Sequence, residues 1–101
     1  MKGSERAGLR AEAHHLDPTV HVGHQELSPA VIASMEDALR TRELVKVKLA
    51  KQTDVRPKDA AEALALATGS DVIQVIGRTA TLYRRNEDLK IKPGDPPAWR
   101  R

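Results

Sequence analysis

The chain has 101 residues, of which 40% are hydrophobic and 31% are charged, and it contains no cysteine. This length suits one domain with one core, and no apolar run reaches the roughly 20 residues that a membrane-spanning helix needs. The lack of cysteine excludes disulfides and thiolate metal sites, and we expect a cytoplasmic protein without a secretory signal.

The formal net charge of +3 is unevenly distributed along the chain. Residues 84–101 contain six basic and three acidic residues, whereas residues 1–83 contain eleven of each. A nucleic-acid partner would therefore have to contact either the C-terminal segment or a basic patch on a formally neutral body.

Residues 5–16 are predicted to form a first helix, with Ser4 as its N-cap. Its apolar residues recur at helical spacing: Leu9, Ala13 and Leu16. Asp17 ends the helix, because a residue before a proline is disfavoured in the α conformation. Residues 19–22 alternate between apolar and polar, which predicts a short, half-buried strand.

The second helix has the clearest start in the sequence. Ser28 is a good N-cap, and Pro29 at the first helical position loses no hydrogen bond, so the helix is predicted to run to about Arg42. Glu36 and Arg40 are spaced for an ion pair on its outer surface. The predicted buried stripe consists of Val31, Met35, Ala38 and Leu39.

Residues 44–50 alternate strictly and predict a second strand, with Lys46 and Lys48 on the face opposite its valines. A third helix is predicted to begin at Pro57 and to end at Gly69, which can adopt the left-handed conformation of a helix end. Its predicted inner stripe consists of Ala60, Leu64 and Ala67.

Residues 71–76 and 79–84 are two β-rich runs separated only by Gly77-Arg78, a pattern typical of a type II′ hairpin. Beyond them the chain is polar and rich in proline. We therefore expect residues 1–85 to form the domain and residues 86–101 a flexible basic tail. Trp99 in this tail is either exposed or folded back onto the domain.

The predicted order α-β-α-β-α-β-β indicates an α/β protein, an α+β two-layer sandwich whose four-stranded mixed sheet has its helices mainly on one face. The residues expected to face the helices are Val20, Val45, Val47, Ile73, Val75 and Leu82. Those expected on the other face are His21, Lys46, Lys48, Gln74, Thr81 and Tyr83. This second face is polar and basic and contains no acidic residue, which makes it the basic patch that the charge distribution requires.

Three segments carry a family resemblance: AHHLDPTVHVG at 13–23 followed by LSP at 27–29, LVKVKL at 44–49, and QVIGRTATLYR at 74–84. In these segments the chain resembles the CRM domain (chloroplast RNA splicing and ribosome maturation) in its single-domain bacterial, YhbY-like form. The resemblance implies a fold like the C-terminal domain of translation initiation factor three. It also implies an RNA-binding protein that assists ribosome assembly on precursors of the large subunit.

One loop departs from the family pattern, which has Gly-x-x-Gly with a basic residue inside it. Here the segment is Gly23-His24-Gln25-Glu26, so that a carboxylate replaces the second glycine. A carboxylate repels phosphate, and this shifts the expected RNA contact toward the sheet face and the hairpin. The candidate RNA-binding residues are Gly23, His24, Gln25, Lys46, Lys48, Arg78, Tyr83 and Arg84.

No catalytic constellation, metal site or cofactor motif is recognisable. His14 and His15 are adjacent, so that on a helix they point about 100° apart, which is poor for sharing one ion. We expect a monomer that binds structured RNA, the rRNA of large-subunit precursors, and neither a membrane nor a small-molecule substrate.

Two alternatives remain open at this point. One is an Alba-like protein that coats nucleic acid, which competition between duplex DNA and structured RNA would separate from the first reading. The other is a protein-interaction module that has lost RNA contact at its glycine loop, which Glu26 and the neutrality of residues 1–83 would favour.

Overall fold

The order of helices and strands follows the sequence prediction. The computed structural model describes residues 1–23, 27–51 and 55–100. Its elements are α1 (Gly3–Ala13), β1 (Val20–Val22), α2 (Pro29–Arg42), β2 (Leu44–Leu49), α3 (Pro57–Thr68), β3 (Asp71–Ile76), β4 (Thr79–Tyr83) and the 3-10 helix η1 (Ala98–Arg100). The α-β-α-β-α-β-β order is thus confirmed, with η1 added after it.

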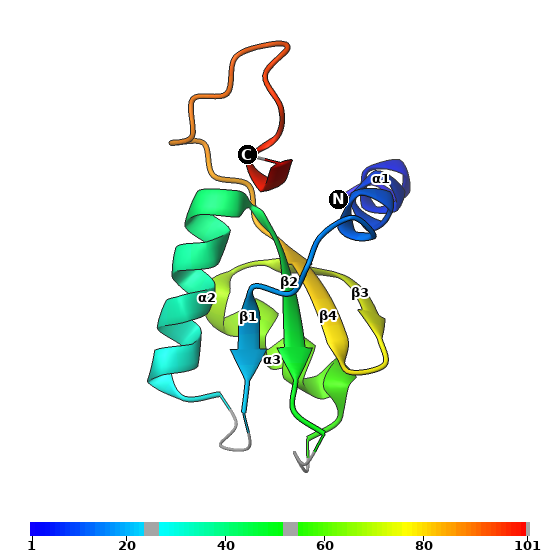
Figure 1. Cartoon of the computed structure of the whole chain (residues 1–101), viewed down its shortest axis with the longest axis vertical. Helices are drawn as coiled ribbons and strands as arrows, with labels where there is room; N and C mark the ends of the chain where they lie inside the picture. Colours follow the sequence, from blue (N-terminus) through cyan, green and yellow to red (C-terminus); the bar gives the residue numbers. More distant parts are fainter. Residues whose placement is uncertain (24–26, 52–54, 101) are drawn as a thin grey trace.

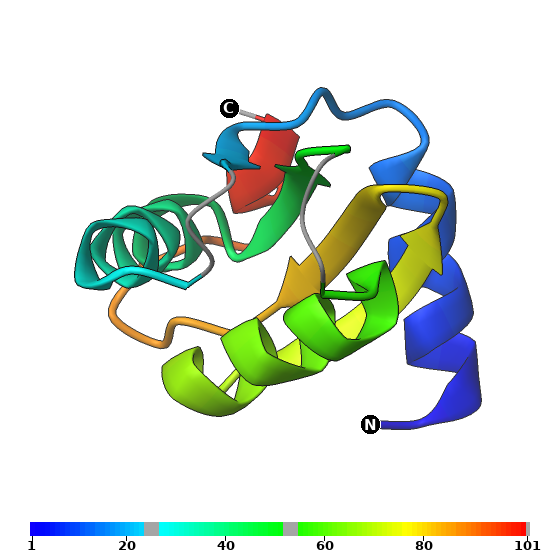
Figure 2. The same cartoon turned by 90° about the horizontal axis from the view of Figure 1, so that it is seen from below.

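The four strands form one mixed sheet in the order β1-β2-β4-β3 (Figure 1). β1 and β2 are parallel, whereas β4 pairs antiparallel with both β2 and β3. The parallel pair is joined through α2, as a crossover connection requires. In Figure 2, α3 lies on one side of the sheet and η1 on the other.

The main core lies between the sheet and the helices α2 and α3. Side chains from the strands and from both helices point into this core. Its fully buried members include Met35, Leu39, Val47, Leu64 and Leu82. In β1, β2 and β4 the core positions alternate, as in Val20 and Val22 or Val45 and Val47, which confirms the predicted inward orientation of the valines of β1 and β2.

A second, smaller core lies on the opposite face of the sheet. Its buried members are Leu9, Ala13, Leu44 and Ile73, and partly buried Leu16, Tyr83 and Trp99 pack against it. α1 and η1 therefore cover one end of the face that the sequence predicted to be open.

Ile73 belongs to this second core, so the prediction that it faces α2 and α3 is wrong. The cause is a β-bulge in β3: Val72 is paired with Leu82 and Gln74 with Thr81, which leaves Ile73 as the extra residue. The bulge places Ile73 and Gln74 on the same face, whereas Val75 still faces the main core.

The ends of α2 and α3 and the turn of the hairpin agree with prediction. The hydroxyl of Ser28 accepts a hydrogen bond from the backbone N–H of Val31 at 3.2 Å. Gly69 ends α3 with φ +65°, in the left-handed region. Gly77 has φ +55°, whereas Arg78 does not have positive φ, as a type II′ turn requires.

Four local predictions are wrong. Ser4 lies inside α1, which begins after Lys2 with no side-chain cap, and α1 ends at Ala13, three residues before the predicted end at Leu16. Ala67 is exposed, and Thr68 takes its inward place because its hydroxyl donates to the carbonyl of Leu64 at 2.7 Å. Arg40 pairs with Asp37 at 2.7 Å rather than with Glu36.

Glu43 is the single residue that joins α2 to β2, and it adopts φ +64°. Its side chain is buried, and its Oε2 accepts a hydrogen bond from the backbone N–H of Asn86 at 2.7 Å. The amide of Asn86 donates in turn to the carbonyl of Arg40 at 2.7 Å. These bonds attach the start of the C-terminal segment to the end of α2.

Candidate nucleic-acid interface

The strand register arranges the side chains opposite α2 and α3 in three rows. The outer row is His21, Lys48, Thr79 and Ile76; the middle row is Lys46, Thr81 and Gln74; the inner row is Leu44, Tyr83 and Asp71. Side chains two residues apart on a strand point to the same face, so the three rows form one continuous surface.

The outer and middle rows together form a surface that we call the open half-face. His21 and Lys48 are exposed there, Lys46 is half-buried, and Thr81 is buried between its neighbours on the two adjacent strands. None of the seven residues of these two rows is acidic. A surface with two lysines and no carboxylate attracts phosphate groups, although residues 1–83 are neutral as a whole.

Lys46 stands in the middle row, at the border between the open half-face and the covered end of the sheet. Its ammonium nitrogen donates to the carbonyl of Leu16 at 3.1 Å. This bond uses one of three N–H donors and leaves two for another partner. The side chain is thus held in place with most of its hydrogen-bonding capacity still available.

Arg78 extends the positive charge to the rim of the open half-face. It occupies the tip of the β3–β4 hairpin and is exposed. Its guanidinium donates to the carbonyl of Ala50 at 3.1 Å, and its own carbonyl accepts from the N–H of Leu49 at 2.8 Å. The hairpin tip is therefore fixed beside the end of β2, close to Lys48.

Leu44 and Tyr83 of the inner row are covered, whereas Asp71 at its β3 end is exposed. The expectation that this face of the sheet contains no acidic residue is therefore wrong at Asp71 and holds only for the outer and middle rows. Tyr83 meets Trp99 edge to face, with the ring centroids 6.2 Å apart and the planes at 88°. Burial, and to a smaller extent the carboxylate of Glu43, raises the pKa of Tyr83. Of the two placements that the sequence leaves open for Trp99, the structure has the folded-back one.

An ion pair holds η1 against α1. The guanidinium of Arg100 donates two hydrogen bonds to the carboxylate of Glu12, and these lower the pKa of that carboxyl group. Trp99 and Arg100 are thus both used in packing the C-terminal segment onto the covered end of the sheet.

The remaining predicted residues lie elsewhere. Arg84 donates to Glu36 on α2 at 2.8 Å and to the carbonyl of Thr68 on α3 at 2.8 Å, so its charge is directed away from the open half-face. Gly23 is exposed at the end of β1, whereas His24 and Gln25 lie outside the described residues. RNA contact by these four residues, as by Lys46, Lys48, Arg78 and Tyr83, stays a prediction.

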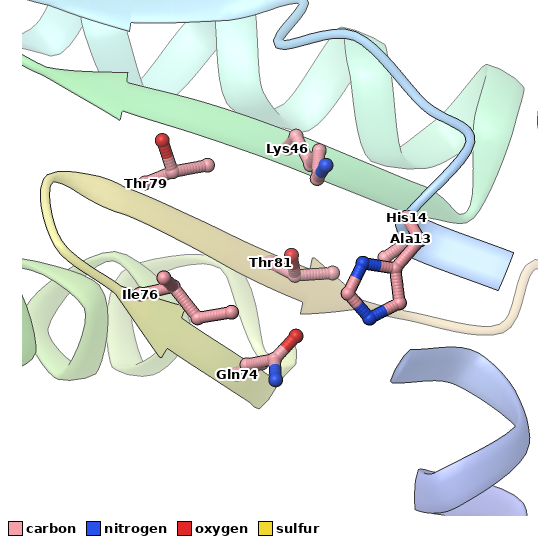
Figure 3. Close-up of a pocket in the computed structure, with 7 residues that line it drawn as sticks. All are labelled: Ala13, His14, Lys46, Gln74, Ile76, Thr79 and Thr81. Atoms are coloured by element: carbon pink, nitrogen blue, oxygen red, sulfur yellow. The ribbon is translucent and has the colours of Figure 1, made fainter. Parts of the chain in front are cut away.

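Sequence reasoning missed a hollow of about 200 Å³ in the middle of this surface (Figure 3). It is lined by Ala13, His14, Lys46, Gln74, Ile76, Thr79 and Thr81. The alternation of residues 74–76 and 79–81 was a usable signal for its strand residues. His14 could not be found this way, because its place depends on how α1 packs across the sheet.

In the described ranges 1–23, 27–51 and 55–100, no three His, Asp or Glu side chains come together as a metal site would require. None of the helices in those ranges has the length and apolar character needed to cross a membrane.

Known proteins similar to this chain are named for RNA binding. The "Probable RNA-binding protein YqeI" of Bacillus subtilis is 34% identical over 90 residues, which cover 89% of this chain and 94% of that protein. The "RNA-binding protein" of Haemophilus influenzae is 37% identical over 92 residues, covering 91% of this chain and 93% of that protein.

A solved structure and a family model indicate the same family as these relatives. The solution structure of SAV1595 from Staphylococcus aureus matches with a TM-score of 0.77 and 33% identity, covering 89% of this chain and 94% of that one. The model of the CRS1 / YhbY (CRM) domain matches residues 1–84, which include all three rows of the sheet face. The chain therefore belongs to the CRS1/YhbY family of CRM domains.

Proposed function

We propose that this chain binds structured RNA through the open half-face and Arg78, and that it assists ribosome assembly on precursors of the large subunit. The observation that carries the proposal is the register of Lys46 and Lys48 in two rows that hold no acidic residue. The names of the relatives support RNA as the partner.

The geometry favours contacts to phosphates and 2′-hydroxyl groups over contacts to a duplex groove. The open half-face is a sheet surface with lysines spaced two residues apart, and it presents no helix that could enter a groove. Structured RNA is recognised mostly through its shape, its 2′-hydroxyls and its phosphates. In this account the chain is a cytoplasmic, monomeric binding protein that catalyses no reaction, with residues 1–85 as the binding domain.

Binding itself is tested with large-subunit rRNA fragments at stepped salt concentrations. Affinity is expected to fall steeply as salt rises, because phosphate contacts release counterions. A duplex DNA competitor that displaces the RNA at equal concentration would favour the Alba-like alternative instead. No binding of any rRNA at low salt would contradict the proposal.

The assembly role is tested by sedimenting cell extract through a gradient and following the protein across the fractions. Co-migration with precursors of the large subunit is the expected result. A protein found only at the top of the gradient would contradict the assembly role and leave RNA binding to be judged from the titrations.

A further inference from the structure

The hollow in the open half-face has walls of different chemistry (Figure 3). β4 supplies the hydroxyl and methyl groups of Thr79 and Thr81, and β3 supplies Gln74 and Ile76. Lys46 closes the side toward β2, and His14 at the end of α1 closes the side toward the covered core. Five of the seven lining residues are polar, and Ala13 and Ile76 supply the apolar part of the lining. Polar groups that converge beside an apolar wall can fix the orientation of a small ligand.

Ile76 gives this hollow an exposed apolar wall. Its side chain is 58% exposed and stands in the outer row beside the polar residues Lys48 and Thr79. A single exposed isoleucine is common on protein surfaces and does not by itself indicate a binding site. This one lies beside a concave surface, where it offers a flat aromatic group a place to pack.

Gln74 supplies the polar group, and the β-bulge is what aims it. Without the extra residue, Ile73 would stand opposite Thr81, and Gln74 would point into the main core opposite Ala80. With the bulge, Gln74 is paired with Thr81 and lines the hollow. Bulges commonly re-aim a side chain in this way beside functional sites.

The amide of Gln74 has both a donor and an acceptor, and among the described residues its side chain makes no hydrogen bond. It can therefore pair with a group that presents both a donor and an acceptor on one edge, as every nucleobase does. Lys46 and Lys48 lie on β2, across β4 from Gln74, where they can contact the phosphates that flank such a base.

We propose that this hollow receives a single unstacked base from a loop or bulge of the bound RNA. The base packs against Ile76 and the threonine methyl groups, and its edge pairs with the amide of Gln74. At about 200 Å³ the hollow is smaller than the sites of most drug-sized ligands, a size that suits one base. The inference rests on the proposed function, and it adds that the preferred RNA has an unpaired nucleotide.

The test uses RNA hairpins that differ only at one bulged position, which holds A, C, G, U or an abasic sugar. Wild-type protein is expected to bind at least one base-bearing hairpin about fivefold or more tightly than the abasic one, which corresponds to burying roughly 40 Å² of apolar surface. Ile76→Ala is expected to reduce this preference to less than about twofold. Gln74→Ala is expected to weaken it by about threefold or more, as loss of one hydrogen bond does.

The control is Leu66→Ala on α3, an apolar side chain that is 88% exposed and lies on the other side of the sheet. This variant is expected to keep the preference, and circular dichroism of all three variants confirms that they fold. Equal binding of the base-bearing and abasic hairpins by wild-type protein would overturn the inference. If the Lys46→Glu, Lys48→Glu double variant nevertheless lost affinity for both, the proposed function would stand without it. Failure of every hairpin to bind at low salt would overturn both.

Discussion

The two ends of one sheet face differ in composition and in what covers them. Leu44 and Tyr83 of the inner row are packed under α1 and η1, whereas the outer and middle rows carry Lys46 and Lys48, and all of their side chains except that of Thr81 are at least partly exposed. The same two strands, β2 and β4, contribute to both ends. A step of two residues along β2, from Leu44 to Lys46, is thus enough to pass from a core to a candidate interface.

This difference shows how a formally neutral body can present a basic surface. At the covered end, Glu12 and Glu43 are used in hydrogen bonds, and Asp71 stands exposed at the β3 edge of the inner row. The lysines stand on the open rows, where no carboxylate offsets their charge. We therefore expect substitutions at the covered end to lower the stability of the fold and substitutions at the open end to weaken RNA binding.

The largest expected effect is on stability at the covered end. Leu44→Ala removes a fully buried side chain and is expected to lower the free energy of unfolding by about 2–5 kcal/mol. Lys48→Ala, four residues along the same strand but exposed, is expected to change it by less than about 0.5 kcal/mol. Urea denaturation measures both values, and similar losses in the two variants would contradict the division of the face.

The next largest effect is on RNA affinity at the open end. The double variant Lys46→Glu, Lys48→Glu is expected to bind rRNA at least about tenfold more weakly and to show a smaller dependence of affinity on salt. The matched control is Arg56→Glu, Lys58→Glu at the start of α3, which changes the net charge by the same amount on exposed residues of the other face. An equal loss in the control would mean that only net charge matters.

Removal of Trp99 tests the cover of the inner row. Trp99→Ala is expected to cost about 1–3 kcal/mol of stability, because the side chain is only partly buried. It should also bring the pKa of Tyr83 down toward its ordinary value, since burial is the main cause that raises it. Tyr83 is the only tyrosine, so its titration can be followed by ultraviolet absorbance.

The direction of the pH effect follows from that raised pKa. The folded state holds the phenolic proton more tightly than the unfolded chain does, so stability is expected to fall as the pH rises above about 10. In Trp99→Ala this fall should be smaller. An unchanged Tyr83 titration in the variant would show that η1 does not cover the ring in solution.

The smallest effect concerns Arg84, which the sequence suggested as an RNA contact. Its ion pair with Glu36 is partly exposed, and a double-mutant cycle with Arg84→Gln and Glu36→Gln is expected to give a coupling energy of about 0.5–1 kcal/mol. A coupling energy of zero would show that Glu36 does not hold Arg84 in place. The guanidinium would then be available to RNA, and the interface would extend beyond the open half-face.

The sequence predicted those parts of the fold that depend on local chemistry. Ser28 followed by Pro29 marked the start of α2, Gly69 the end of α3, and Gly77 the turn of the hairpin, because each residue type suits one backbone conformation. The alternation of residues 44–50 also predicted the open side of Lys46 and Lys48.

The sequence could not predict features set by contacts between distant segments. The bulge at Ile73 depends on the register between β3 and β4, which alternation alone does not fix. Glu36 pairs with Arg84 across 48 positions rather than with Arg40 on its own helix. The place of Trp99 depends on the apolar part of the inner row, which is assembled only when α1 folds across the sheet.

The most direct test of the account is a backbone amide NMR titration of the protein with a large-subunit rRNA fragment. We predict the largest chemical-shift changes at Lys46, Lys48, Gln74, Arg78 and Thr81, with α3 and the inner row nearly unchanged. Changes confined to α3, or to the segment around residues 23–28 with the open half-face unaffected, would contradict the assignment of RNA binding to this surface.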